Sequence, residues 1–168
     1  DVAVTGVQTC ALPISCEAAI ASVPIELIVP FSQLNLLQSV KLYNADGSEY
    51  QVEWYKVYDS NQELKDWVQL NFPVEVELVE YIVSDQALPI HIDLGRNSAY
   101  NYLIDTGGHN LVTQFYSDDK TTIIDSCEYQ VNRWYQLNVG IPHSVEGTQT
   151  HPRFLISVTP KSGITYKF

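Results

Sequence analysis

The pattern of apolar and polar positions changes along this chain at about residue 73. Beyond that point, short runs rich in β-branched and aromatic residues follow one another, separated by turn sequences such as DTGG at 105–108 and SDDK at 117–120. Short apolar runs at such spacing predict antiparallel strands. The expected strands are 74–83, 88–94, 98–104, 111–116, 121–131, 134–139, 141–146 and 153–159.

Eight short strands in succession are typical of a β-sandwich, a barrel or a jelly roll. The alternation of strands and helices that marks a doubly wound fold is missing from the pattern. The motifs GxGxxG, GxxxxGK[ST] and GxSxG are also missing from the sequence, which argues against dinucleotide binding, a P-loop and a hydrolase nucleophile elbow. We therefore expect a mainly β domain.

The first half of the chain has a weaker pattern. We expect strands at 23–29 and 49–58 and short helices at 32–42 and 61–70. Ser32 and Ser60 precede the two helical segments and are candidate N-caps, because a serine hydroxyl accepts hydrogen bonds from the first free amides of a helix. The apolar spacing of 32–42 is ambiguous, whereas that of 61–70 places its apolar residues largely on one face.

The first fifteen residues, DVAVTGVQTCALPIS, show no usable hydrophobic period. This string resembles a translated sequencing-adapter read-through, which would make residues 1–15 a non-native segment outside the fold. We then expect one domain over residues 16–168, with its β core at about 74–159. The alternative is an ordinary irregular N-terminal arm.

Charge and cysteine content narrow the classes of function. The 168-residue chain carries a formal net charge of -11, which repels phosphate backbones and disfavours nucleic acid as a partner. Three cysteines, an odd number with no CxxC pair, predict reduced thiols in a cytoplasmic protein rather than a disulfide framework or a zinc site. No apolar run is long enough to predict a membrane span.

The sequence His91-Ile92-Asp93 lies in an expected strand. Because side chains alternate faces along a strand, His91 and Asp93 share one face while Ile92 faces the other. One imidazole and one carboxylate side by side can be two ligands of one metal. A second histidine from another strand would complete the facial triad that binds non-haem iron(II). His143, 52 residues after His91 (143 − 91) and in a later expected strand, is the best candidate.

Arg153 lies ten residues after His143 (153 − 143) and opens the last expected strand. Alternation places Phe154, Ile156 and Val158 on one face of this strand and Arg153 on the other. An arginine that points between two sheets needs an anion, and its planar fork binds a carboxylate in bidentate fashion.

The order HxD, a distal histidine about fifty residues later and an arginine about ten residues beyond resembles the iron(II) and 2-oxoglutarate-dependent oxygenases. The run HIDLGRNSAYNYLI is similar to small members of this family from phages and environmental bacteria. The surroundings of the distal histidine and the arginine resemble the aspartyl/asparaginyl hydroxylase-like branch. The similarity covers about residues 74–159.

The resemblance implies a double-stranded β-helix, also called a jelly roll or cupin-like fold, with one or two short N-terminal helices. It implies that His91, Asp93 and His143 bind Fe(II) and that Arg153 binds the far carboxylate of 2-oxoglutarate. It further implies that Asn101, with Tyr100 and Tyr102 behind it, helps to hold this cosubstrate. The expected activity is hydroxylation of a small molecule or a protein side chain, with succinate and carbon dioxide as co-products.

Two alternatives stay open. One is a cupin-like metal-binding protein that does not use 2-oxoglutarate, in which Arg153 would have no obvious role. The other is a non-enzymatic jelly roll, such as a viral structural domain, which requires no convergence of His91, Asp93 and His143. Arg96, in the turn after HxD, is a weaker candidate for contact with substrate, and His109 and His151 are expected in exposed turns or loops.

Overall fold

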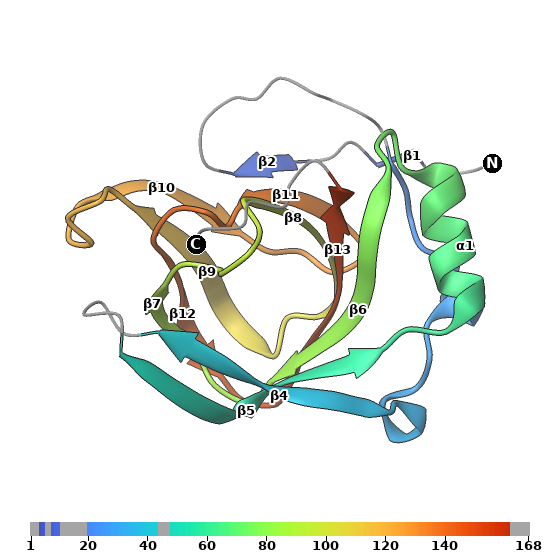
Figure 1. The fold of residues 1–168 in the computed structure, drawn as a ribbon, viewed down its shortest axis with the longest axis horizontal. Coiled ribbons are helices and arrows are strands. Elements are labelled where there is room, and N and C mark those ends of the chain that lie inside the picture. Colours follow the sequence, from blue (N-terminus) through green and yellow to red (C-terminus); the bar gives the residue numbers. More distant parts are fainter. Residues whose placement is uncertain (1–3, 6–7, 11–19, 44–47, 162–168) are drawn as a thin grey trace.

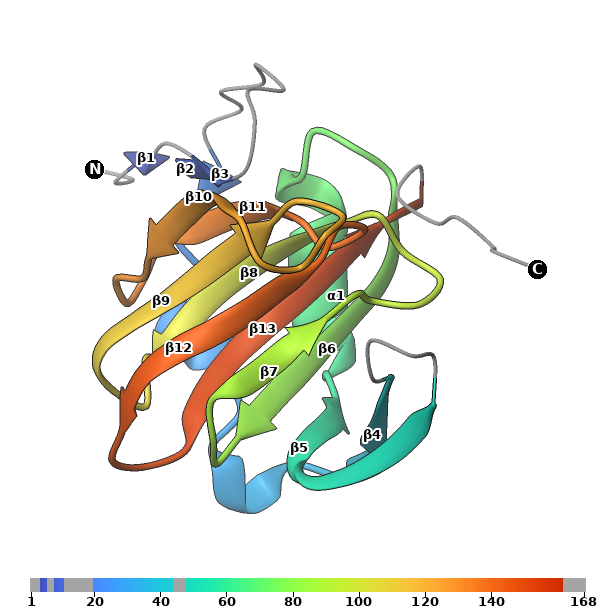
Figure 2. The same cartoon turned by 90° about the vertical axis from the view of Figure 1, so that its left-hand side faces the viewer.

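A computed structural model describes residues 4–5, 8–10, 20–43 and 48–161 of the chain. Its strands form two main, largely antiparallel sheets that face each other, as Figures 1 and 2 show. The strands are β1 Val4–Thr5, β2 Gln8–Cys10, β3 Ile20–Ala21, β4 Leu36–Tyr43, β5 Glu49–Asp59, β6 Val76–Ser84, β7 Leu88–His91, β8 Ser98–Asp105, β9 Gly108–Tyr116, β10 Ile123–Glu128, β11 Trp134–Asn138, β12 His143–Gln149 and β13 Arg153–Pro160. This is the mainly β jelly roll that the sequence predicts.

The two sheets differ in size. The larger one has the strand order β2-β11-β8-β13-β6-β5-β4, and the smaller one has the order β10-β9-β12-β7. Neighbouring strands in each sheet come from distant parts of the chain, so β13 pairs with both β6 and β8, while β12 pairs with both β7 and β9. Strand β7 therefore lies at one edge of the smaller sheet.

Apolar side chains from the facing surfaces of the two sheets form the inner core. One cluster joins residues of the larger sheet, such as Leu103 and Leu155, to Phe115 of the smaller sheet. A smaller cluster contains Leu88, Leu111 and Val145. Alternation along the strands supplies these residues, since every second side chain points inward.

The outer face of the larger sheet is also covered. Helix α1 (Gln62–Asn71) lies beside β6 in Figure 1 and buries Leu64 and Val68 against the sheet. The 3-10 segments Ile25–Leu27 and Phe31–Gln33 precede β4, and Leu27 packs against the same cluster. Burial on both faces explains why apolar residues occupy both faces of β13 between Phe154 and Val158.

The helix over 61–70 is confirmed, but its N-cap is Asn61. The Asn61 side chain accepts a hydrogen bond from the Leu64 amide at 2.8 Å. Ser60, the predicted cap, is buried and its hydroxyl donates to the Val79 carbonyl instead. Asparagine and serine are equally good caps, so sequence alone does not choose between these neighbours.

Two other expectations in this half of the chain are wrong. Residues 32–42 do not form a helix, because Leu36–Tyr43 is strand β4, which pairs with β5. Residues 23–29 do not form a strand, because Ile25–Leu27 is a 3-10 turn between Pro24 and Ile28. Pairing with a neighbouring strand overrides an ambiguous local pattern in the first case.

Only parts of residues 1–15 lie within the described residues. There, β1 pairs with β3, and β2 pairs in parallel with β11 at the edge of the larger sheet. The prediction that residues 1–15 are non-native stays a prediction. Cys127, expected as a reduced thiol, is disulfide-bonded; its partner's side chain lies outside the described part. No helix among the described residues is long and apolar enough to cross a membrane.

Candidate metal centre

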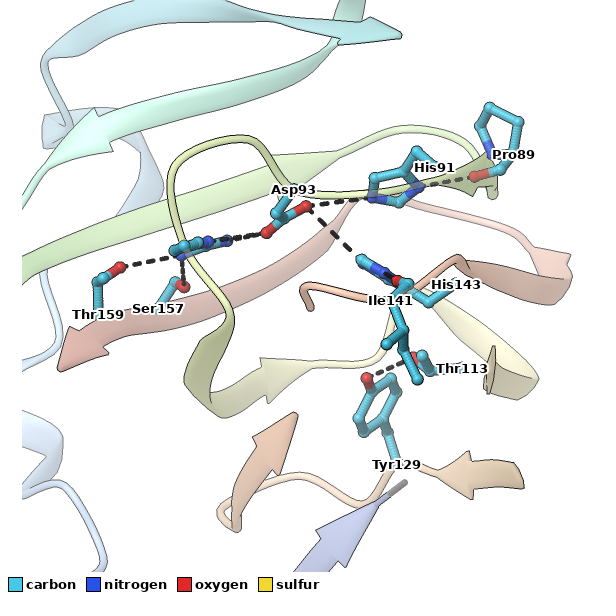
Figure 3. Close-up of polar contacts among 10 residues, drawn as sticks. Pro89, His91, Asp93, Thr113, Tyr129, Ile141, His143, Ser157 and Thr159 are labelled. Atoms are coloured by element: carbon cyan, nitrogen blue, oxygen red, sulfur yellow. Dashed lines mark hydrogen bonds and ion pairs between the residues drawn. The ribbon is translucent and has the colours of Figure 1, made fainter. Parts of the chain in front are cut away.

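Two strands of the smaller sheet bring the predicted histidines together. His91 is the last residue of β7, His143 is the first of β12, and the two are direct partners in the antiparallel register. Asp93 follows just beyond the end of β7, where its amide donates to the Val139 carbonyl at 3.0 Å. The predicted strand 88–94 is thus shorter than expected, yet Asp93 still faces the two imidazoles (Figure 3).

The donor atoms of the three residues converge. Asp93 Oδ1 lies 3.5 Å from His91 Nε2 and 3.8 Å from His143 Nε2. One donor atom from each residue lies within 4.8 Å of the others. Ligands 2.0–2.2 Å from a common ion are about 3–4 Å apart, so these separations suit a divalent metal.

Backbone carbonyls fix the orientation of both imidazoles. His91 Nδ1 lies 2.7 Å from the Pro89 carbonyl oxygen, and His143 Nδ1 lies 2.9 Å from the Ile141 carbonyl oxygen. A carbonyl only accepts, so each Nδ1 donates, and in the neutral ring Nε2 is left with its lone pair. Both Nε2 atoms face Asp93 (Figure 3). This is the tautomer that metal binding through Nε2 requires.

Arg96 holds the other oxygen of Asp93. Its Nε and Nη2 atoms each lie 2.7 Å from Asp93 Oδ2. Its Nη1 atom donates to Ser157 Oγ and Thr159 Oγ1, both at 3.1 Å. These hydroxyls belong to β13, so Arg96 connects the loop after β7 to the opposite sheet.

The site favours an ionised carboxylate at Asp93 and a neutral imidazole at His143. Burial alone would raise the pKa of Asp93, but Arg96 and the two histidines outweigh it and hold this pKa well below its usual range. Burial and the neighbouring His91 lower the pKa of His143 to about 4. At neutral pH the centre therefore presents one carboxylate oxygen and an unprotonated His143, a donor set that attracts a cation.

The triad lines a small cavity between the two sheets. Its volume is about 30 Å³, and its wall includes Asn101, Tyr55 and Arg153 in addition to the triad. Arg153 is only 4% exposed, and its Nε has no hydrogen-bond partner. Asn101 Oδ1 is also buried without a partner. These unpartnered polar atoms beside the same cavity are available to hydrogen-bond a bound molecule or water.

Other residues singled out in the sequence lie elsewhere. Tyr102 and Tyr100 point to the outer face of the larger sheet, into the cluster beneath α1. The Tyr102 hydroxyl interacts there with Ser22 and the backbone of Val23. Alternation along β8 separates these tyrosines from Asn101, so Tyr102 does not line the described cavity.

Both remaining histidines are exposed, as expected. His109, however, lies in strand β9 rather than in the expected turn. His151 follows β12, and its Nε2 lies 2.8 Å from Asp105 Oδ1.

Three features of the site were not predicted from the sequence. The partnership of Arg96 with Asp93 could have been found from their spacing of three residues in a turn, HIDLGR. Tyr55, whose pKa is raised to about 12 by burial and by Asp93, comes from β5, outside the segment that resembles the oxygenases. Tyr129 hydrogen-bonds to Thr113 in the cavity wall, and no sequence signal joins these two residues.

Comparison with known proteins gives similarity of fold only. No protein-family model matches the sequence, and no curated protein is detectably similar to it. The structure is similar to the Drosophila melanogaster CENP-C cupin domain, with 8% identity, a TM-score of 0.46 and coverage of 79% of this chain and 80% of that one. It is also similar to a variant of oxalate decarboxylase from Bacillus subtilis, with 12% identity and a TM-score of 0.43, over 67% of this chain but only 27% of that chain.

Proposed function

We propose that this chain is a non-haem iron(II) and 2-oxoglutarate-dependent dioxygenase that hydroxylates a small molecule or a protein side chain. His91, Asp93 and His143 would hold the iron. When bound, the metal would supply the oxygen-activating chemistry, and the protein would orient the reactants and exclude water. The donor set supports this assignment, since two imidazoles and one carboxylate with other positions open favour non-haem iron.

The proposal rests mainly on the burial of Arg153 beside the triad. Its guanidinium is buried beside the triad, and no ion pair joins it to a carboxylate among the described residues. A buried charge without a counter-ion is costly. A dicarboxylate with one end at the metal and the other at Arg153 would remove this cost.

The surroundings of Arg153 also suit a carboxylate. In the larger sheet Ser84 of β6 is the direct partner of both Arg153 and Tyr55. Direct partners in antiparallel strands share a face, so a guanidinium and two hydroxyls form one inward row. The Ser84 hydroxyl is buried and unpartnered. It would be a second donor to the same carboxylate.

A second candidate is a cupin-like metal-binding protein without 2-oxoglutarate. The cavity beside the triad is small, at about 30 Å³, which favours a small ligand. In this alternative a small anion would neutralise Arg153, and the diacid would not bind.

Anaerobic titration distinguishes the candidates. Purified protein would be titrated with Fe(II) and then with 2-oxoglutarate, while the weak visible charge-transfer band of the chelate is followed. A saturable band would support the dioxygenase, whereas iron binding without the band would favour the second candidate. His91→Ala, Asp93→Ala and His143→Ala should each lose iron binding yet stay folded, and His109→Ala, at an exposed histidine, is the matched control. Wild-type iron affinity in His143→Ala would contradict the metal assignment.

A further inference from the structure

Arg96 holds one oxygen of Asp93 and leaves the other facing the two histidines. We propose that Arg96 is a positioning residue that makes Asp93 bind metal through Oδ1 alone and so keeps an additional coordination position open. The inference rests on the metal-binding part of the proposed function and is independent of 2-oxoglutarate.

The contacts of Asp93 divide its two oxygens. Arg96 Nε and Nη2 both contact Oδ2 at 2.7 Å, which is the length of a strong charge-assisted hydrogen bond. Oδ1 instead lies 3.5 Å and 3.8 Å from the Nε2 atoms of His91 and His143. The metal-facing side of the carboxylate is therefore a single oxygen.

Hydrogen bonds to β13, in the opposite sheet, hold the Arg96 guanidinium in place. Ser157 and Thr159 of β13 accept from Arg96 Nη1 at 3.1 Å each. The Arg96 side chain is 18% exposed, which is close to the 17% of Asp93. A planar donor group anchored at both ends resists rotation, and rotation of the carboxylate would have to break two charge-assisted contacts.

The consequence concerns the number of open positions around the metal. An octahedral ion with two imidazole nitrogens and one carboxylate oxygen keeps three positions free, as in a facial triad. A carboxylate whose second oxygen is free can bind the same ion through both oxygens. Such chelation would close one of the three positions. By preventing this chelation, Arg96 keeps free a coordination position that an exogenous ligand would need.

The test counts the waters on a bound ion and does not use activity. Mn(II) is the probe, and the broadening of its electron paramagnetic resonance lines in 17O-enriched water reports the number of bound waters. Wild type should hold about three waters, and Arg96→Gln, saturated with Mn(II), should hold about two, because Oδ2 becomes free to chelate. Arg96→Lys keeps a cation near Oδ2 and should stay at about three. Arg133→Gln, the same change at an exposed arginine, is the control.

The outcomes separate this inference from the proposed function. If wild type takes up no Mn(II), the metal-binding proposal fails. If wild type binds Mn(II) but Arg96→Gln still holds about three waters, only the role of Arg96 is refuted. A folded Arg96→Gln that binds no Mn(II) would also refute it, because Arg96 would then be required to assemble the site.

A second measurement needs no variant and covers the case in which Arg96→Gln does not fold. The infrared difference between Mn(II)-loaded and metal-free wild type, with 13C-labelled aspartate, reports how the carboxylate binds. Ligation through one oxygen widens the separation of the two carboxylate stretches, and chelation narrows it. A narrowed separation in wild type would overturn the inference.

Discussion

At the scale of single residues, the proposed role of Arg153 is to bind the far carboxylate of 2-oxoglutarate. We predict that Arg153→Ala lowers the affinity of the iron-loaded protein for 2-oxoglutarate by about one to three decades, because it removes a bidentate contact worth on the order of 2–5 kcal/mol in a desolvated site. Arg153→Lys should recover only part of this loss, since an ammonium cannot form the planar fork. Isothermal titration under anaerobic conditions measures both. Unchanged affinity in Arg153→Ala would remove the reason to prefer the dioxygenase.

His143 gives the metal-free protein a predictable response to acid. Its pKa in the fold is about 4, whereas an unfolded histidine titrates near 6.5. Between these values the unfolded chain binds more protons than the folded one, so stability is complete above about pH 6.5 and falls as the pH drops toward 4. The loss should be on the order of 2–3 kcal/mol.

Urea unfolding of the metal-free protein at several pH values measures this loss. Asp93 does not interfere, because its lowered pKa moves its contribution to a window below the ordinary carboxyl pKa of about 4. His143→Gln should flatten the dependence between pH 4 and 6.5. A variant with the same slope as wild type would show that other groups cause it.

The shared face of His91 and Asp93 could be predicted because alternation along a strand is a local signal, whereas the place of His143 beside them depended on the resemblance to a known family. The sequence did not predict that β13 holds the Arg96 side chain, because the contacts of Arg96 with Ser157 and Thr159 span 61 and 63 residues. It assigned Tyr102 to the site with Asn101, although alternation along one strand forbids both from facing the same cavity. Tyr55 was missed because the pairing of β5 with β6, and of β6 with β13, joins segments that no local sequence pattern relates.

At the scale of elements, strands with strong alternation and turn residues at both ends were predicted closely. Residues 98–104 and 153–159 became β8 and β13 with shifts of one residue at their ends. The segment 32–42 failed because leucines and a valine at mixed spacing fit either a helix or a strand. Leu36 and Leu37 are exposed, so the pairing of β4 with β5, rather than burial of these two leucines, favours the strand.

Helix α1 offers a test of which residue begins it. We predict that Asn61→Ala destabilises the protein by about 0.5–2 kcal/mol, because the Leu64 amide loses its side-chain acceptor. Asn61→Ser should cost much less, since a serine oxygen can cap the same amide. Thermal or urea unfolding measures both variants. Equal losses in Asn61→Ala and Asn61→Ser would mean that the contact is not a stabilising cap.

At the scale of the whole molecule, the sequence predicted the class of fold but not the arrangement of strands. Antiparallel strands that pair across distances such as β13 with β6 carry no pairing signal in one sequence. The direct partnership of His143 with His91 is the part of this arrangement that matters most for the site. It could be expected only because the resemblance to a known family required both residues at one metal.

Deletion of residues 1–15 tests whether this segment belongs to the domain. If it is non-native, its removal should cost less than about 2 kcal/mol of stability and leave Mn(II) affinity unchanged. Denaturant unfolding and metal titration of the shortened chain measure these quantities. A larger loss would show that the short pairing of β2 with β11 is an integral part of the fold.

The position of β7 at a sheet edge has a kinetic consequence. Two of the three donor residues, His91 and Asp93, depend on a four-residue strand that pairs only with β12 among the described strands. Edge strands open more readily than central ones. Metal should therefore enter and leave while β7 detaches locally, without global unfolding. Mn(II) should slow hydrogen exchange of the β7 amides by about the factor 1 + [Mn]/Kd, while amides of the central strand β8 change much less.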